Sequence, residues 1–181
     1  GVIPACGTFF VFSDYMKPAV RMAALMEVPI KFIWTHDAFR VGEDGPTHEP
    51  VEQEAQIRLM EKLKNHHGKD SVRVFRPADA DETTVCWAMA MENMDTPTAL
   101  IFSRQNITKL PAGTDYEQAR KGAYIVAGSD DDFDVILLAD GSEVSTLVAG
   151  AELLRKDGIK IRIVSAPSEG LFRSQSKEYQ E

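Results

Sequence analysis

TALIF, at residues 98–102, is apolar almost throughout and runs directly into the polar residues SRQN at 103–106. An apolar run of this length is typical of a strand that is covered on both faces, as the strands of a parallel sheet are. We therefore predict a buried strand over Thr98–Phe102, in a sheet with helices on both sides.

Outward from this strand, predicted strands and helices alternate along the chain. Short apolar runs predict strands at Ile30–Thr35, Val72–Phe75, Ala123–Val126, Asp134–Ala139 and Ile159–Val164. Helical spacing and capping residues predict helices at Tyr15–Met26, Val51–Leu63, Glu82–Glu92 and Glu143–Asp157. This alternation predicts an α/β fold: a mostly parallel sheet with helices on both faces, followed by a second α/β domain.

Some ends and faces of the helices can also be predicted. Ser13 or Asp14 is expected to cap the first helix, and Asp79 or Asp81 the third. Gly158 is expected to end the fourth helix. The residues expected to face the core from the first helix are Ala19, Met22, Ala23 and Met26.

Composition excludes several classes of protein. Of the 181 residues, 44% are hydrophobic and 27% charged, which is ordinary globular composition, and the net charge is −8. The acidic balance disfavours nucleic acid as a partner, and no apolar run is long enough to cross a membrane. Cys6 and Cys86 show no paired spacing, so we predict free thiols in a reducing, cytoplasmic setting. The opening residues, Gly1–Pro4, resemble neither a tail nor a helix start, so we expect a chain cut in mid-structure.

The loop that follows the strand Ile30–Thr35 is the richest candidate site. His36–Pro50 packs two imidazoles, four carboxylates and one guanidinium into fifteen residues. Ligands of an open parallel sheet bind beyond the carboxyl ends of its strands, and imidazole is suited to proton transfer near neutral pH. A solvated polar loop is the plain alternative. A metal site is a weaker one, because the histidine spacing matches no compact metal motif.

Three further features need weighing. Arg104 follows the strand Thr98–Phe102, where it is either a phosphate or carboxylate ligand or a surface arginine. The turn Asp140–Glu143 opens a helix, and Ser142 and Glu143 are expected to cap it themselves. Aromatic side chains cluster near the start of the chain, where they either stack on a flat ring or fill the core; they are Phe9, Phe10, Phe12 and Tyr15.

Several stretches, in order, resemble the transketolase family. The most specific is GEDGPTHEPVEQ at residues 42–53, and the others are TFFVFSDY at 8–15, THD at 35–37, FRPAD at 75–79, PTALIFSRQN at 97–106 and GSEV at 141–144. The resemblance implies that residues 1–110 form a pyrimidine-binding domain that is incomplete at its N-terminal end, 111–121 a linker and 122–181 an incomplete C-terminal domain.

The resemblance also implies a function. The parent enzyme would transfer a two-carbon ketol unit from a ketose phosphate to an aldose phosphate in the pentose phosphate pathway, with thiamine diphosphate and Mg²⁺. Phe9, Phe12 and Tyr15 would surround the pyrimidine ring of the cofactor. His48 would assist proton transfer as the catalytic residue. The substrate would be bound by His36, Asp44, His48 and Arg104.

Part of the family's machinery has no candidate in this sequence. The glutamate that activates the cofactor and the motif that binds Mg²⁺ and the diphosphate are expected outside this chain. We therefore expect a homodimeric parent enzyme, and no activity from the 181 residues alone. The alternative is a non-catalytic or split-gene subunit that acts only with a separate N-terminal section.

Overall fold

The structure, a computed structural model, describes residues 1–181 as two compact units. The first unit comprises Gly1–Phe75 and Trp87–Asn106, and the second comprises Arg76–Cys86 and Ile107–Glu181. Among the helices, none has the length and apolar character needed to cross a membrane.

A four-stranded, wholly parallel sheet forms the centre of the first unit. Its strands lie in the order β1 (Ala5–Phe9), β2 (Lys31–Thr35), β4 (Thr98–Ile101) and β3 (Arg73–Phe75). β4 is an inner strand, and all four of its residues are buried. The predicted buried strand is therefore confirmed. β1 was not predicted, because its sequence, ACGTF, has almost no apolar bulk.

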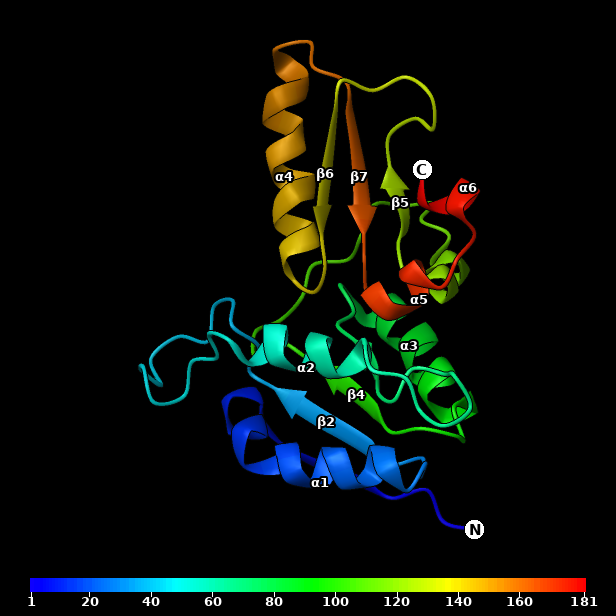
Figure 1. The fold of residues 1–181 in the computed structure, drawn as a ribbon. Coiled ribbons are helices and arrows are strands. Elements are labelled where there is room, and N and C mark those ends of the chain that lie inside the picture. Colours follow the sequence, from blue (N-terminus) through cyan, green and yellow to red (C-terminus); the bar gives the residue numbers. More distant parts are fainter. The chain divides into compact units, whose positions relative to one another are not determined.

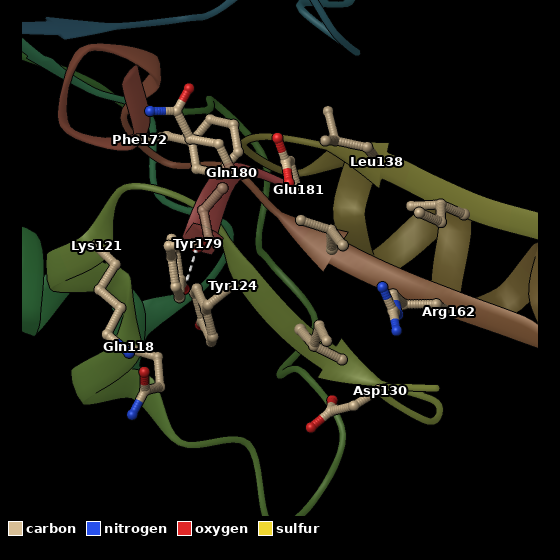
Figure 2. Close-up of a pocket in the computed structure, with 14 residues that line it drawn as sticks. Gln118, Lys121, Tyr124, Asp130, Leu138, Arg162, Phe172, Tyr179, Gln180 and Glu181 are labelled. Carbon is tan, nitrogen blue, oxygen red and sulfur yellow. Dashed lines mark hydrogen bonds between the residues drawn. The ribbon is translucent and has the colours of Figure 1, made fainter. Parts of the chain in front are cut away.

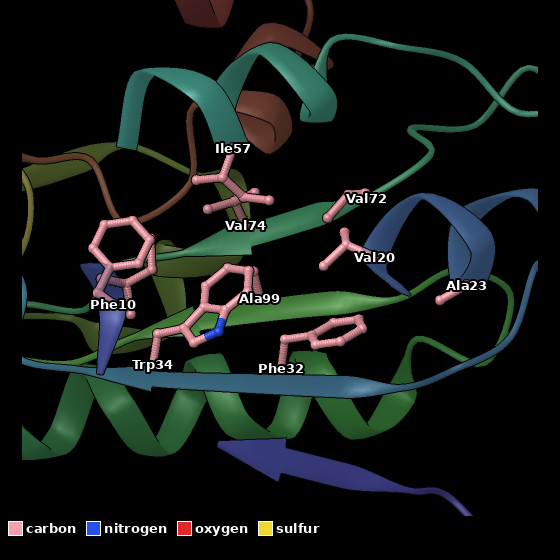
Figure 3. Close-up of a cluster of buried hydrophobic side chains, with 10 residues drawn as sticks. Phe10, Val20, Ala23, Phe32, Trp34, Ile57, Val72, Val74 and Ala99 are labelled. Carbon is pink, nitrogen blue, oxygen red and sulfur yellow. The ribbon is translucent and has the colours of Figure 1, made fainter. Parts of the chain in front are cut away.

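Helices cover both faces of this sheet, as predicted. α1 (Ser13–Leu25) and α2 (Gln53–Glu61) pack on one face, and the part of α3 (Ala80–Glu92) that belongs to this unit, from Trp87 onward, lies on the other (Figure 3). Trp34 of β2 is 1% exposed and lies 5.6 Å from the ring of Phe10 and 5.8 Å from that of Phe32. Ile57 of α2 completes this aromatic core.

The predicted cap and inward face of α1 are largely wrong. The N-cap residue is Phe12, and no side chain caps this end. Asp14 pairs with Lys17 and accepts a hydrogen bond from Gln53 instead. Val20 and Ala23 face the core, whereas Met22 and Met26 are 53% and 64% exposed. Apolar residues occur on both sides of this helix, so its spacing alone did not identify the buried face.

The segment between α2 and β3 folds back on itself through a bridge between Lys64 and Asp70. His67 Nδ1 lies 3.0 Å from a carboxylate oxygen of Glu27, and Lys69 pairs with Asp95. These exposed pairs place the segment at the rim of the first unit.

The second unit contains a three-stranded mixed sheet. Its order is β5 (Tyr124–Ala127), β7 (Ile161–Ser165) and β6 (Val135–Ala139), with β6 parallel and β5 antiparallel to β7. α4 (Glu143–Lys156) runs along β6 and β7 (Figure 1). Gly158, at φ +79°, follows the end of α4 as predicted. The expected α/β fold is thus confirmed, with the antiparallel β5 as a departure.

Three short helices of the second unit were not predicted. They are η2 (Tyr116–Lys121), a 3₁₀-helix, and the helices α5 (Glu169–Arg173) and α6 (Lys177–Gln180). The side chains of Ser168 and Ser176 cap α5 and α6. With β5, β6 and β7 these helices surround a cavity of about 650 Å³, into which Arg162, Phe172 and Tyr179 point (Figure 2).

A buried arginine holds the turn before α4. Arg76 is 4% exposed, and its guanidinium donates to Asp140 at 2.6 Å and to Glu143 at 2.7 Å. Gly141, at φ +57°, lies so close that a Cβ there would be 2.8 Å from Arg76 Nε. The expected self-capping by Ser142 and Glu143 is wrong, because Arg76 binds the Glu143 carboxylate.

The start of α3 carries a second buried polar group of this unit. Asp79 Oδ1 accepts a hydrogen bond from the backbone N–H of Glu82, which confirms Asp79 as a predicted cap. The Glu82 carboxylate accepts from Ser165 Oγ at 2.8 Å, and burial raises its pKa. Burial also raises the pKa of the Cys86 thiol, and both cysteines are free, as predicted.

Candidate functional site

A row of aromatic rings lies at the carboxyl end of β1. Phe9 and Phe12 stack with their ring centroids 6.1 Å apart, and Tyr15 follows 6.2 Å from Phe12. The 3₁₀-turn η1 (Phe10–Phe12) causes this arrangement, because it turns Phe10 into the core and leaves the other three outside it. The structure thereby divides the aromatic cluster into a core residue and three residues that can meet a ligand.

The two histidines of the loop pack against this row. The His36 ring stacks on Phe9 with centroids 3.7 Å apart. His48 sets its ring edge-on to Phe9 and Phe12, at 5.9 and 5.3 Å. His48 therefore lies where the aromatic row meets the polar loop.

A cluster of charged side chains adjoins the histidines. His36 Nε2 lies 3.9 Å from Asp44 Oδ2, and Arg104 Nε lies 4.0 Å from the same oxygen. Both distances exceed a hydrogen bond, so the groups are neighbours that keep hydrogen-bonding capacity for a ligand. Arg104 is half-exposed and comes from the end of β4, while His36 and Asp44 come from the loop after β2.

The backbone of the loop explains how these groups converge. His36, Arg40, Gly42 and Gly45 all have positive φ, from +59° to +89°. A Cβ on Gly42 would lie 3.6 Å from Arg104 Nη1, so the loop approaches this side chain closely. Left-handed backbone is uncommon at a residue other than glycine, and it often marks functional positions.

The loop after β2 and the segment after β4 thus converge, whereas the turn before α4 does not take part. The loop 36–50 and the segment 103–106 meet at Asp44 and Arg104, within the first unit. The turn Asp140–Glu143 belongs to the second unit and is held by Arg76. The structure contains no group of three or more His, Cys, Asp or Glu side chains arranged to hold a metal ion.

Sequence reasoning missed two side chains of this site. Thr35 Oγ1 lies 3.0 Å from His36 Nδ1, and Thr47 Oγ1 lies 2.8 Å from His48 Nδ1. The available signal was the dipeptide Thr-His, which occurs twice in the sequence.

The arrangement offers a flat, ring-stacking surface next to two imidazoles, a carboxylate and a guanidinium. Such a set fits a heteroaromatic ring and a phosphorylated, hydroxyl-bearing molecule side by side. The fold and the cluster therefore define an α/β protein whose candidate ligand site lies beyond the carboxyl ends of parallel strands.

Comparison with known proteins identifies the family. Residues 1–109 match the family model described as transketolase, pyrimidine binding domain, and residues 122–181 match the transketolase-like TK C-terminal domain. The chain belongs to the transketolase family.

Individual relatives agree with this assignment. The chain is 49% identical over 176 residues to a transketolase of Halalkalibacterium halodurans, covering 96% of this chain and 25% of that protein. The solved transketolase of Leishmania mexicana superimposes with a TM-score of 0.87 at 39% identity, over 99% of this chain and 25% of that one. The solved structure of a transketolase of Pichia stipitis in complex with sedoheptulose-7-phosphate superimposes with a TM-score of 0.85 at 40% identity, over 97% of this chain and 24% of that one. The chain spans about a quarter of the length of these relatives.

Proposed function

We propose that this chain is a segment of an enzyme that transfers a two-carbon ketol unit from a ketose phosphate to an aldose phosphate. The observation that carries the proposal is the convergence of the aromatic row with His36, Asp44, His48 and Arg104. A solved family member was determined with a sugar phosphate, which supports this class of substrate. The parent would be a cytoplasmic homodimer that acts in the pentose phosphate pathway.

The aromatic row fits one part of thiamine diphosphate. Phe9, Phe12 and Tyr15 would surround the pyrimidine ring, with Phe12 as the stacking residue. Phe12 is partly exposed and Tyr15 is 83% exposed, so both offer ring surface to a ligand. When bound, the cofactor supplies the electron sink for cleavage of a carbon–carbon bond.

The metal-binding part of the cofactor site is assigned elsewhere. Mg²⁺ is held by oxygen ligands, and this chain contains no group of three or more His, Cys, Asp or Glu side chains that could hold a metal ion. On the family resemblance, we propose that the ligands of Mg²⁺ and of the diphosphate, and the glutamate that activates the cofactor, lie in other parts of the parent enzyme.

The polar cluster of His36, Asp44, His48 and Arg104 would bind the sugar phosphate. His48 would move protons at the reacting hydroxyls, because imidazole serves as acid or base near neutral pH. Asp44 would accept a hydrogen bond from the hydroxyl next to the reacting carbonyl. Arg104 and His36 would donate to the phosphate, since guanidinium suits phosphate oxygens. Residues 1–110 would form the pyrimidine-binding domain, 111–121 the linker and 122–181 part of the C-terminal domain.

The 181 residues alone are expected to have no ketol transfer activity. They are also expected to show no rise in melting temperature with thiamine diphosphate and Mg²⁺. A ligand stabilises a fold to an extent that its affinity sets, and the proposed ligands of the diphosphate and Mg²⁺ lie outside this chain. A coupled transfer assay and thermal denaturation check both points, with the intact enzyme as the control. Measurable transfer by this chain alone would contradict the proposal.

The alternative is a split-gene subunit that pairs with a separate N-terminal section. The retained polar cluster fits either case. The two differ in the DNA upstream of the codon for Gly1. An in-frame continuation that encodes the activating glutamate supports a single chain, and a start codon at this point supports a split enzyme.

A further inference from the structure

The two histidines of the cluster share a feature that the other two histidines lack. His36 and His48 each follow a threonine whose hydroxyl lies within hydrogen-bond distance of Nδ1. His66 and His67 follow Asn65 and His66, so neither has a preceding threonine. The Thr-His pairing therefore coincides with membership of the cluster.

The surroundings of His36 indicate which ring nitrogen carries hydrogen. A neutral imidazole has one N–H donor and one bare nitrogen acceptor. Nε2 faces the Asp44 carboxylate at 3.9 Å, and a hydrogen on Nε2 is electrostatically favoured there. Nδ1 is then the acceptor, and the Thr35 hydroxyl donates to it across 3.0 Å.

The rest of the environment leaves the ring one important freedom. Stacking on Phe9 fixes the plane of the imidazole, and the left-handed backbone at φ +61° fixes where the side chain starts. Neither feature distinguishes the ring from the same ring turned over, which would set a carbon beside the hydroxyl. The two groups that distinguish these orientations are Asp44, which lies 3.9 Å from Nε2, and Thr35, which alone of the two lies within hydrogen-bond distance of a ring nitrogen.

We propose that Thr35 is a positioning residue that holds His36 as its Nε2–H tautomer and presents that donor to the site. The proposal rests on the function given above, in which His36 meets the phosphate of a sugar. A single orientation prepares the donor before the ligand arrives, which lowers the cost of ordering on binding. Thr47 forms the same bond to His48, but that pair is exposed and water competes for it.

Matched variants test this role in the chain itself. Thr35→Val keeps the shape and the strand propensity but removes the hydroxyl, and Thr35→Ser restores it. Nitrogen-15 chemical shifts of the imidazole report its tautomer. Loss of one net hydrogen bond should change the tautomer ratio of His36 about fivefold in Thr35→Val. Thr35→Ser should keep the native ratio, Thr47→Val should change that of His48 less, and His66 and His67 serve as internal references.

The intact enzyme separates this inference from the proposed function. Thr35→Val should raise KM for the aldose phosphate about fivefold while kcat stays within about twofold, and Thr35→Ser should recover the native KM. Unchanged nitrogen-15 shifts in Thr35→Val would overturn the positioning role of Thr35. Altered shifts with an unaltered KM would keep that role and overturn phosphate binding by His36.

Discussion

Gly122→Ala is expected to unfold the second unit, with a loss of about 4 kcal/mol or more in its free energy of unfolding. Gly122 ends η2 with φ +89°, which costs about 1–2 kcal/mol at a residue with a Cβ. The larger part comes from overlap. A Cβ there would lie 2.3 Å from both Ser168 O, at the N-cap of α5, and Phe172 N, within α5. Ser168 N also donates to Gly122 O, so the two segments cannot separate without losing that bond.

Gly113→Ala provides the matched control for this prediction. Gly113 has φ +88°, and nothing lies within 4 Å of the Cβ position. The Gly113→Ala variant should therefore lose only about 1–2 kcal/mol of its free energy of unfolding, which is the cost of left-handed backbone at a residue with a Cβ. Urea denaturation, followed by hydrogen exchange of the β7 amides, measures the free energy of unfolding of the second unit. Equal losses in the two variants would contradict the close contact between Gly122 and α5.

His48→Ala in the intact enzyme is expected to lower kcat by about 10²–10⁴-fold. His48 is the side chain that touches both Phe9 and Phe12 and lies in the same loop as Asp44. Removal of the imidazole takes away the proposed proton carrier, while the phosphate-binding pair remains, so KM should change little. Steady-state kinetics with a ketose phosphate donor and an aldose phosphate acceptor measures both constants.

His66→Ala is the control for His48→Ala. His66 is exposed and lies in the folded-back segment before β3, outside the cluster. Its loss should leave kcat within about twofold, because surface changes away from a site have small effects. A similar fall in both variants would indicate a general loss of folding, and no fall in His48→Ala would exclude proton transfer by this residue.

The sequence was most informative where one pattern dominated. The TALI run is buried because it lies between two strands in a sheet with helices on both faces, and an almost wholly apolar segment suits that position. Asp44 and Arg104 were found because strand ends of a parallel sheet gather ligands, and the structure brings the two together. Their roles in binding remain predictions.

Other features depended on contacts between distant segments. α1 has methionine and alanine on two sides, so only the packed core shows that Val20 faces inward. Arg76 follows a strand, like Arg104, yet it is buried and binds Asp140 and Glu143, 64 and 67 positions later. β1 has one bulky side chain, Phe9 at its end, and is defined by its pairing with β2. Local propensity contains no information about such partners.

The proposal that the polar cluster binds a sugar phosphate is tested most directly by how strongly the enzyme prefers a phosphorylated aldose to the unphosphorylated one. The quantity is kcat/KM of the intact enzyme for an aldose phosphate, divided by kcat/KM for the same aldose without phosphate. Hydrogen bonds to charged groups contribute about 1.5–3 kcal/mol, so Arg104→Leu should lower this ratio by about tenfold to a hundredfold. An unchanged ratio in Arg104→Leu would contradict the account.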